Sequence, residues 1–567
     1  MGVSASGTIL GLPPTLSLPH KGGGDGNGER GRCLRGTHLM PSPLEKLIDL
    51  SSTPAALTAQ ADTMLERARW ASEVYQRYDR ARVLKIAEAI ANAAHEKAEA
   101  YAEWAVRETG FGVVAHKKIK NELTARPFLD YYRDWDFVNP RTDPNTGVVE
   151  VPKPAGVIFA LVPSTNPIAT INFKAICAIL TRNAIVLSPH PAARECCVDA
   201  VRMLARVAEA AGAPDGIIQV VERPAIPLID QFMKSEKTDV ILATGGNAMV
   251  RSAYSSSNPA LGVGPGNAPC YVDNSADLKH AAYCIAESKS FDNSVLCTNE
   301  SVLIVHAAIA EALSRELEKA GCYLCNEEET SQLRTYLFHD RGFNLEAIGR
   351  EATWIAAKAG LRVPPKTKVL ITPISMIGVD EPLSKEKLCP VLAMFTATSR
   401  SQAIATARAV LRFQGAGHSS AIHCKDAQTI LDFAAAVESY RVVVNAPCSQ
   451  GAAGFGTNLA PTFTVGTGFF GRSSIGENLG PQHLVHWTRV AFGAESRDLA
   501  RGVSSSGYSL PGPLPEAPSD GVPGKSAMSL GQMSSAGGTL PADPNYAALR
   551  EEIRRVIAEE LREALKG

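Results

Sequence analysis

The sequence predicts an α/β protein with two domains, each built around a parallel sheet. The chain has 567 residues, more than one compact core usually holds. Short β-rich runs alternate with helix-compatible stretches from residue 157 to residue 243, and a second series of this kind starts near residue 268. Because this alternation is typical of βαβ units, we expect two parallel sheets.

The N-terminal segment does not fit this alternation. Residues 1–40 include the run Gly22-Gly23-Gly24-Asp25-Gly26, which cannot build a core, and we expect a disordered extension. Met40 is followed by Pro-Ser-Pro-Leu-Glu-Lys and is the more natural start. We therefore hypothesise that translation starts at Met40 and that residues 1–39 come from a start site assigned too far upstream.

The first structural series begins with a helix and continues with four strands. Val83, Ile86 and Ile90 recur at helical spacing, and Asp79 is placed to cap the start of this helix. The expected strands cover residues 157–162, 184–187, 217–221 and 240–243. In the second series, which starts near Ala268, they cover residues 301–305, 369–371, 391–395, 420–423 and 442–444.

Two segments fit neither series and are predicted to be extended arms. Residues 136–149 and 482–495 are better suited to strand addition between subunits than to a core. We therefore expect a homo-oligomer, either a dimer or a tetramer.

The C-terminal part is predicted to be a linker followed by an amphipathic helix. Residues 499–544 are rich in Gly, Pro and Ser, which is typical of a flexible tether. In residues 545–567, Leu549, Ile553, Val556 and Leu561 lie on one helical face, with Glu and Arg on the other. Such a helix favours docking into a partner's groove, and self-docking or a coiled coil is the alternative.

Composition and charge exclude several classes of protein. Apolar residues make up 45% and charged residues 20% of the chain, and the formal net charge is -1. This balance does not favour binding to nucleic acid or to an anionic membrane. Apolar stretches such as Gly156–Val162 are far shorter than the roughly 20 residues that span a bilayer, and the N-terminus does not resemble a secretory signal. We expect a cytoplasmic protein.

The twelve cysteines are expected to be mostly small buried side chains in a reducing cytosol. The pair Cys322 and Cys325 has no second pair and no nearby His ligands, so we interpret it as packing and predict no metal site.

Cys297 is the candidate nucleophile. It lies in the polar segment Asp292–Glu300 between a helix and a strand, where a loop can expose the sulfur while its backbone stays fixed. Asn166 ends a strand and opens a helix, so its side-chain amide can face an oxyanion. The turn Thr244-Gly245-Gly246 allows a dinucleotide to approach a helix N-terminus.

These motifs together resemble the aldehyde dehydrogenase superfamily, and within it the coenzyme A-acylating propionaldehyde and acetaldehyde dehydrogenases of microcompartments. The similarity covers roughly residues 44–493. It rests on the ordered motifs Pro163-Ser164-Thr165-Asn166-Pro167, Ser188-Pro189-His190-Pro191, Thr244-Gly245-Gly246, Gly262-Val263-Gly264-Pro265-Gly266-Asn267, Ser294-Val295-Leu296-Cys297-Thr298, Glu386-Lys387-Leu388-Cys389-Pro390-Val391 and Gly415-Ala416-Gly417-His418.

The resemblance implies a three-part fold. A Rossmann-like cofactor domain would comprise residues 41–135 and 150–263, and an α/β catalytic domain residues 264–470. The two arm segments would form a small β oligomerisation arm.

The resemblance also assigns roles to site residues. Cys297 would be the nucleophile, Asn166 the oxyanion donor, and Glu386 the group that holds the nicotinamide ribose. Thr244, Gly245 and Gly246 would lie at the phosphates of NAD. Alone, Glu386 could be a solvated charge and the glycines any tight turn, so their order along the chain carries the assignment.

An absence indicates the acyl acceptor. Hydrolytic members of the superfamily have a glutamate base in the motif upstream of the cysteine, where this chain has Gly262–Gly266. Loss of a general base costs about 10²–10⁴ in rate, so a thiol acceptor, coenzyme A, is favoured over water. In Ser188-Pro189-His190, Ser188 occupies the position where hydrolytic members usually have a lysine that holds the adenine ribose. We therefore expect the cofactor and CoA sites to differ from those of the hydrolytic enzymes.

Two histidines have competing interpretations. His418 matches a histidine of the acylating group. A histidine side chain titrates near neutral pH, so it could take a proton from Cys297 or from the CoA thiol. Alternatively, His418 could bind a backbone carbonyl. His190 could contact a phosphate or adenine, or serve structure alone.

The sequence thus predicts NAD-dependent, CoA-acylating oxidation of a short-chain aldehyde, with propionaldehyde favoured. The C-terminal helix resembles an encapsulation peptide, so we expect shell proteins as partners and the lumen of a bacterial microcompartment as the location. The alternatives are a hydrolytic aldehyde dehydrogenase and a catalytically silent shell-interaction protein.

Overall fold

The computed structural model describes residues 53–339 and 342–503, together with residues 510 and 513. The predicted N-terminal extension, most of the predicted linker and the C-terminal helix lie outside the described residues. No helix in the described ranges is long and apolar enough to cross a membrane.

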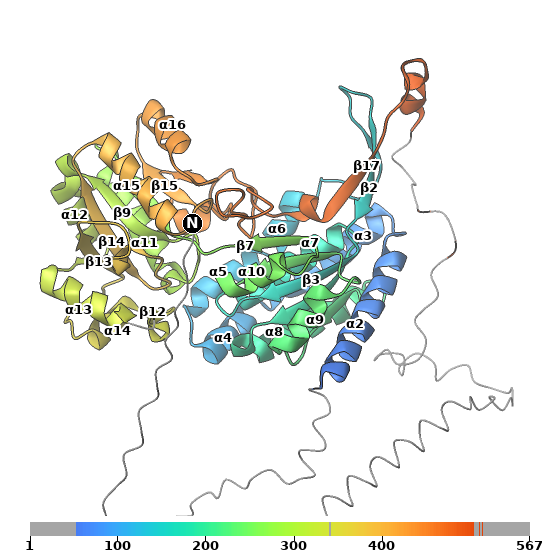
Figure 1. The fold of residues 1–567 in the computed structure, drawn as a ribbon, viewed down its shortest axis with the longest axis horizontal. Helices are drawn as coiled ribbons and strands as arrows, with labels where there is room; N and C mark the ends of the chain where they lie inside the picture. The colour runs from blue at the N-terminus through green and yellow to red at the C-terminus, as the bar shows by residue number, and fades with distance from the viewer. Residues whose placement is uncertain (1–52, 340–341, 504–509, 511–512, 514–567) are drawn as a thin grey trace, which may run out of the picture. The chain divides into compact units, whose positions relative to one another are not determined.

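The first sheet has five parallel strands in the order β5-β4-β3-β6-β7 (Figure 1). The strands are β3 (Val157–Val162), β4 (Ala184–Pro189), β5 (Ile218–Val220), β6 (Val240–Thr244) and β7 (Ala260–Val263). All six residues of β3 are buried, as expected for a central parallel strand with helices on both faces. The four predicted strands are confirmed, and β7 was missed.

The helices connected to this sheet precede it or link its strands. They are α2 (Pro54–Tyr75), α3 (Arg80–Glu96), α4 (Ala98–Thr109), α5 (Val114–Leu123), α6 (Arg126–Tyr132), α7 (Pro167–Leu180), α8 (Arg194–Ala210), α9 (Ile226–Lys234) and α10 (Asn247–Tyr254). The predicted cap of α3 is confirmed, because the side chain of Asp79 accepts the backbone N–H of Arg82.

The second sheet has seven parallel strands in the order β10-β13-β14-β9-β8-β15-β16. The strands are β8 (Ala268–Val272), β9 (Glu300–His306), β10 (Cys322–Leu324), β13 (Val369–Ile374), β14 (Val391–Ala397), β15 (Ser420–His423) and β16 (Val442–Val444). The connecting helices are α11 (Leu278–Ser290), α12 (Ala310–Lys319), α13 (Glu327–Leu337), α14 (Ala352–Lys358), α15 (Arg400–Phe413), α16 (Ala427–Ala436) and α17 (Cys448–Gly451). A two-stranded ribbon, β11 (Phe338–His339) with β12 (Gly342–Phe343), lies apart from this sheet.

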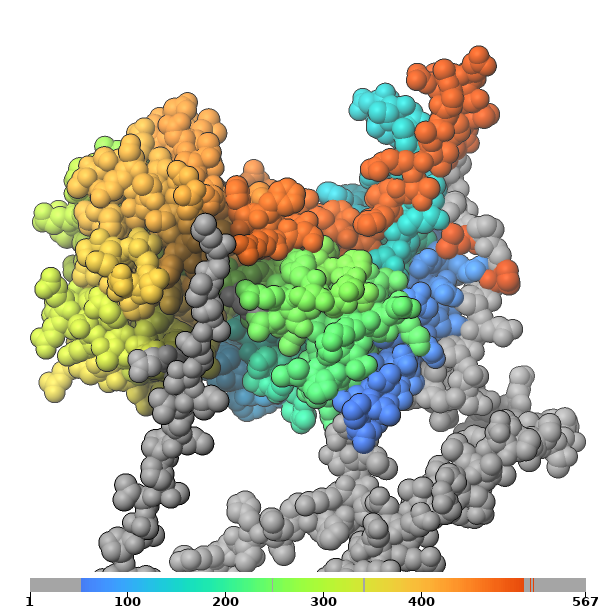
Figure 2. All heavy atoms as spheres, viewed as in Figure 1, coloured from blue at the N-terminus to red at the C-terminus, as the bar shows by residue number. Residues whose placement is uncertain are grey.

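The two predicted arms pair with each other. The strands β1 (Arg141–Thr142), β2 (Val149–Pro154) and β17 (Val485–Val490) form an antiparallel sheet that projects from the rest of the described chain (Figure 2). β2 continues past the predicted boundary at residue 149, because its pairing with β17 extends to Pro154. The role of the arm in oligomerisation stays a prediction, as do the domain boundaries.

The described residues include the start of the predicted linker. Residues 499–502 belong to the 3-10 helix η8 (Ala494–Gly502), in which Ala500 is buried. The change in composition therefore comes before the end of regular structure. Cys322 and Cys325 are buried free thiols, which agrees with their interpretation as packing residues.

Candidate active site

The main cavity lies where the strands of the first sheet end. Its volume is about 520 Å³, and residues at the carboxyl ends of β3, β4, β6 and β7 line it. The chain passes from β5 back to β6 beside β3, so the strand order reverses at this point, where ligands bind in open α/β sheets. Nine of the ten predicted site residues line the cavity: Cys297, Asn166, Ser188, Pro189, His190, Thr244, Gly245, Gly246 and Glu386. His418 does not.

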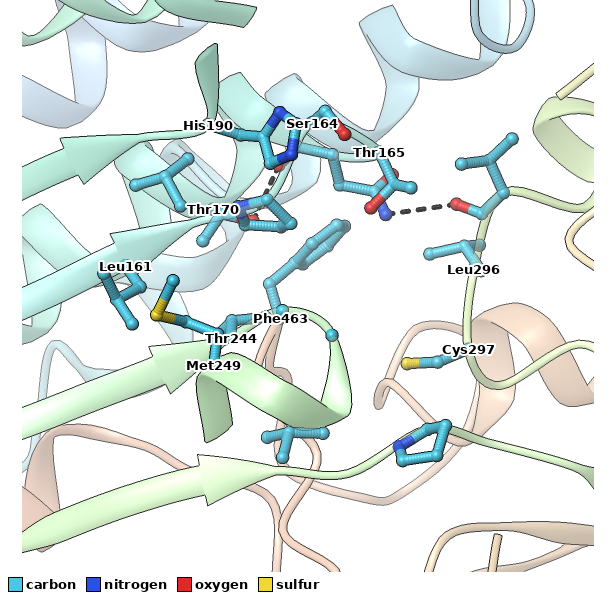
Figure 3. A pocket seen from close by; sticks show the side chains of 18 of the residues that line it. Leu161, Ser164, Thr165, Thr170, His190, Thr244, Met249, Leu296, Cys297 and Phe463 are labelled. Atoms are coloured by element: carbon cyan, nitrogen blue, oxygen red, sulfur yellow. Dashed lines mark hydrogen bonds between the residues drawn. The ribbon is translucent and has the colours of Figure 1, made fainter. Parts of the chain in front are cut away.

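Cys297 lies on the loop between the 3-10 turn η3 (Phe291–Ser294) and β9, as the sequence predicts. Its thiol lies across the cavity from Leu161 and Thr244 of the first sheet (Figure 3). The 3-10 turn before this loop bends the chain sharply, because Asp292, Asn293 and Ser294 all have positive φ. A side chain at Gly266 would overlap the carbonyl oxygen of Cys297, so the loop before β8 passes against the nucleophile's backbone.

The protein groups around Cys297 keep its thiol protonated. Burial raises the pKa of Cys297 to about 12, and the carboxyl group of Glu386 adds to this rise. The guanidinium of Arg441 opposes it. Since the thiolate is the nucleophile, formation of the reactive species must accompany binding or proton removal.

Asn166 lines the cavity and contacts the segment that carries the nucleophile. Its Nδ2 donates to the carbonyl oxygen of Val295 at 3.1 Å, and its Oδ1 accepts from Lys120. An amide nitrogen carries two hydrogens. Since Asn166 lines the cavity and one hydrogen is used by Val295, the other is available to an oxyanion.

Glu386 is the one carboxylate among the described residues that line the cavity. It accepts the backbone N–H of Gly266 at 3.2 Å, and burial raises its pKa to about 8. The stretch Gly262–Gly266 contributes Val263, Gly264 and Pro265 to the lining and therefore no base. The cavity still contains a carboxyl group, from a segment distant in sequence.

The turn between β6 and α10 leaves room for a ligand in the cavity. Gly245 and Gly246 form the turn from β6 to α10, and nothing lies within 4 Å of a side chain added at either. Backbone N–H groups at such a helix start suit phosphate oxygens. The buried hydroxyl of Ser188 has no hydrogen-bond partner among the described residues and lines the same cavity. A bound ligand could satisfy it.

The two histidines have different environments. His190 is exposed, and its Nδ1 accepts the backbone N–H of Ala192 at 3.1 Å, so it has a structural contact beside any ligand role. His418 is completely buried, with Nδ1 3.0 Å from the hydroxyl of Ser419. Burial and Arg441 lower its pKa to about 3, which makes it a weak base. This arrangement does not support the predicted proton transfer by His418.

Sequence reasoning missed other lining residues. Phe463, Thr462 and Val465 come from the loop after α17, and Thr170 comes from the first turn of α7. The loop residues carry no local motif, because only the chain's long-range path brings them to the cavity. Thr170 follows Asn166 at one helical turn and donates its hydroxyl to the carbonyl oxygen of Asn166 at 2.6 Å, a spacing that could have identified it.

The chain belongs to the aldehyde dehydrogenase family, whose sequence profile matches residues 42–490. The predicted family and fold class are thereby confirmed.

Acylating enzymes are among its relatives. Succinate-semialdehyde dehydrogenase (acetylating) of Clostridium kluyveri is 34% identical over 76% of this chain and 95% of its own length. The aldehyde-alcohol dehydrogenase of Clostridium acetobutylicum is 37% identical over 76% of this chain but 51% of its own length. The chain therefore spans about half the length of that curated relative.

Solved structures of acylating enzymes share the fold. An acetylating aldehyde dehydrogenase of Geobacillus thermoglucosidasius has 37% identity and a TM-score of 0.76, covering 78% of this chain and 98% of its own. A propionaldehyde dehydrogenase from the fucose utilisation microcompartment of Clostridium phytofermentans has 30% identity and a TM-score of 0.70, covering 76% and 97%. The propionaldehyde dehydrogenase of Rhodopseudomonas palustris, with bound CoA and an acylated cysteine, has 27% identity and a TM-score of 0.70, covering 76% and 97%.

Proposed function

We propose that this chain oxidises a short-chain aldehyde, with propionaldehyde favoured, to its acyl-CoA while reducing NAD. The observation that carries the proposal is the meeting of Cys297 and Asn166 in one cavity where Gly262–Gly266 supplies no base. Acylating members among the relatives, one solved with CoA and an acylated cysteine, support it.

The first half of the reaction acylates Cys297. The Cys297 thiol releases its proton to solvent and the thiolate attacks the aldehyde carbon, so that the carbonyl oxygen becomes an oxyanion that the free N–H of Asn166 stabilises. The thiohemiacetal then loses hydride from carbon, and its C–O bond becomes the carbonyl of a thioester. NAD, when bound, supplies the hydride acceptor.

The residues proposed to hold NAD all line the cavity. Glu386 lies beside the nucleophile and would hold the nicotinamide ribose. Thr244, Gly245 and Gly246 would receive the phosphates at the start of α10. Ser188, Pro189 and His190, at the end of β4, would border the adenosine part.

The second half transfers the acyl group to coenzyme A. The CoA sulfur attacks the thioester carbon, the bond to the Cys297 sulfur breaks, and the thiolate of Cys297 is regenerated. Water is a poor competitor because Gly262–Gly266 supplies no base, and Glu386, which accepts the N–H of Gly266, is proposed to hold the nicotinamide ribose. Such sequential use of one nucleophile is ping-pong chemistry.

The dependence of NADH formation on CoA tests this proposal. With propionaldehyde and NAD, we expect a burst of about one NADH per Cys297 without CoA, and steady turnover after CoA is added. Cys297→Ser should abolish both. Equal steady rates with and without CoA would identify a hydrolytic enzyme, and no NADH from C2 to C4 aldehydes would favour a silent shell-interaction protein.

We also propose that residues 545–567 direct the enzyme into a microcompartment lumen by binding shell proteins. This segment lies outside the described residues, so its amphipathic sequence and the microcompartment origin of one solved relative support the proposal. Deleting residues 541–567 should leave the CoA-dependent rate unchanged and abolish co-purification with shells. Full encapsulation of the truncated enzyme would contradict the targeting role.

A further inference from the structure

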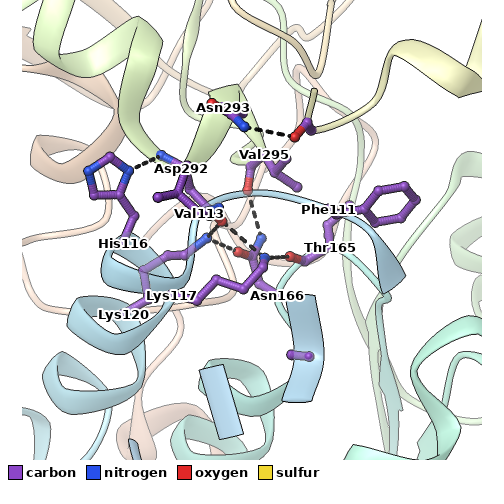
Figure 4. A network of polar contacts seen from close by, with 12 residues as sticks. Phe111, Val113, His116, Lys117, Lys120, Thr165, Asn166, Asp292, Asn293 and Val295 are labelled. Atoms are coloured by element: carbon purple, nitrogen blue, oxygen red, sulfur yellow. Dashed lines mark hydrogen bonds and ion pairs between the residues drawn. The ribbon is translucent and has the colours of Figure 1, made fainter. Parts of the chain in front are cut away.

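A buried polar network lies behind the nucleophile loop (Figure 4). At its centre is Asp292, five residues before Cys297, whose Oδ2 receives Lys117 at 3.0 Å and also Lys120. Its Oδ1 accepts the backbone N–H of Val113 at 2.7 Å. The side chains of Lys117, Lys120 and Asp292 are 4%, 3% and 0% exposed, so solvent does little to screen these charges.

The charges in this network do not cancel. Two ammonium groups meet one carboxylate, and neither lysine has another acidic partner within ion-pair distance in the part of the chain that the structure describes. The ammonium of Lys117 also donates to the carbonyl oxygen of Thr165 at 2.8 Å. The pair of Lys117 and Asp292 would be neutral without Lys120. Lys120 is therefore an additional buried cation, which is costly unless it has a use.

The second partner of Lys120 indicates that use. Its ammonium donates to Oδ1 of Asn166, while Nδ2 of the same amide donates to the carbonyl oxygen of Val295. With Oδ1 held by a cation, the amide cannot flip, and its nitrogen stays on the side of the nucleophile loop. A cation at Oδ1 also polarises the amide and strengthens its N–H groups as donors.

We propose that Lys120 is a positioning residue for the reaction, which holds and polarises the Asn166 amide so that its free N–H meets the oxyanion formed on Cys297. This inference rests on the proposed function. Lys120 contacts both Asp292, which lies just before the loop that carries the nucleophile, and Oδ1 of Asn166. These two buried contacts therefore fix the oxyanion donor relative to the nucleophile. Burial lowers the pKa of Lys120 to about 7, although Asp292 opposes this fall, so the polarising cation is about half populated at neutral pH and predominates below pH 7.

A double-mutant cycle tests this inference. Lys120→Met removes the charge at similar length, and it should slow the single-turnover NADH burst about 10- to 100-fold, against about 10²- to 10³-fold for Asn166→Ala. If Lys120 acts through Asn166, adding Lys120→Met to Asn166→Ala should change the rate by less than about twofold. Lys118→Met is the matched control, because Lys118 is on the same helix but pairs with Glu99 at the surface.

Alkylation of Cys297 by iodoacetamide separates positioning from structural damage. The reagent needs no oxyanion donor, so Lys120→Met should alkylate within about threefold of the wild-type rate. Lys120→Gln, which retains a donor without the charge, supplies the same cycle if the Met variant is insoluble.

Three outcomes would overturn the inference: equal losses from Lys120→Met in both backgrounds, no loss in the wild-type background, or failure of both Lys120 variants to fold. In each case the proposed function stands. If the wild-type enzyme shows no burst and no CoA-dependent rate, the proposed function fails instead.

Discussion

At the scale of single residues, the central feature is a nucleophile that is held in its unreactive form. Burial, and to a smaller extent Glu386, raise the pKa of the Cys297 thiol to about 12. The pKa of Glu386 itself is about 8. The two groups share one cavity, so ionisation of Glu386 works against ionisation of Cys297. Cofactor binding that engages Glu386 would relieve this opposition.

The pH dependence of alkylation tests this coupling. Below its pKa, the thiolate fraction of Cys297 rises about tenfold per pH unit, so its alkylation rate in cofactor-free enzyme should keep rising from pH 6 to pH 9. Glu386→Gln removes the carboxylate that raises the thiol's pKa, and it should speed alkylation several-fold at pH 9 and little at pH 6. A rate that levels off below pH 8 would contradict this account of the thiol.

The identities of the site residues were predictable from sequence, but their electrostatics were not. Cys297, Asn166 and the turn at Gly245 each follow or precede a recognisable element, so local pattern locates them. The burial of His418 and the approach of Glu386 to Cys297 depend on contacts between distant segments. For this reason the expectation that His418 acts as a base finds no support in its buried environment.

At the scale of elements, the loop that joins the first sheet to the second helps to fix the position of the nucleophile. The loop between β7 and β8 passes so close to the Cys297 backbone that Gly266 has no room for a side chain. The same Gly266 donates its N–H to Glu386, so this loop orders both groups.

Gly266→Ala should therefore damage catalysis by displacing the nucleophile. An added methyl group would overlap the Cys297 carbonyl, and a shift of about 1 Å in reacting groups can cost about 100-fold in rate. Gly493→Ala is a suitable control, because nothing lies within 4 Å of a side chain added there. A kcat for Gly266→Ala within about threefold of wild type would show that the loop tolerates the displacement.

Elements with strong apolar runs were predicted well, and weakly patterned ones were not. The continuous buried run of β3 was placed with its observed bounds. α2 was missed because much of its buried face consists of small residues such as Ala61, Ala68 and Ala71, which give a weak periodic signal. A glycine interrupts β7 (Ala-Leu-Gly-Val) and β10 (Cys-Tyr-Leu) has no β-branched residue, whereas the equally short β16 is Val-Val-Val and was predicted.

At the scale of the whole molecule, the arm presents a strand whose edge is unpaired within the described ranges. β17 pairs with β2 along one edge, and its other edge has no strand partner among the described residues. Such an edge invites pairing with another chain. This arrangement supports the proposal that the arm joins subunits into a dimer or tetramer.

Thr488→Pro tests the arm's role, since proline removes a backbone donor and distorts the strand where Thr488 pairs with Val151. We expect light scattering to report a smaller assembly than for wild type, with Thr488→Val as the control that keeps the strand. An unchanged mass for the proline variant would exclude the arm as the main subunit contact.

The location of the acyl group is the most direct test of the central claim, that one sulfur is acylated in a cavity where no base activates water. Enzyme mixed with propionaldehyde and NAD, with CoA withheld, should carry a propionyl group on the peptide that contains Cys297. Addition of CoA should remove it as propionyl-CoA. An acyl group on another residue, or NADH formation with no acyl group on the protein, would contradict the account.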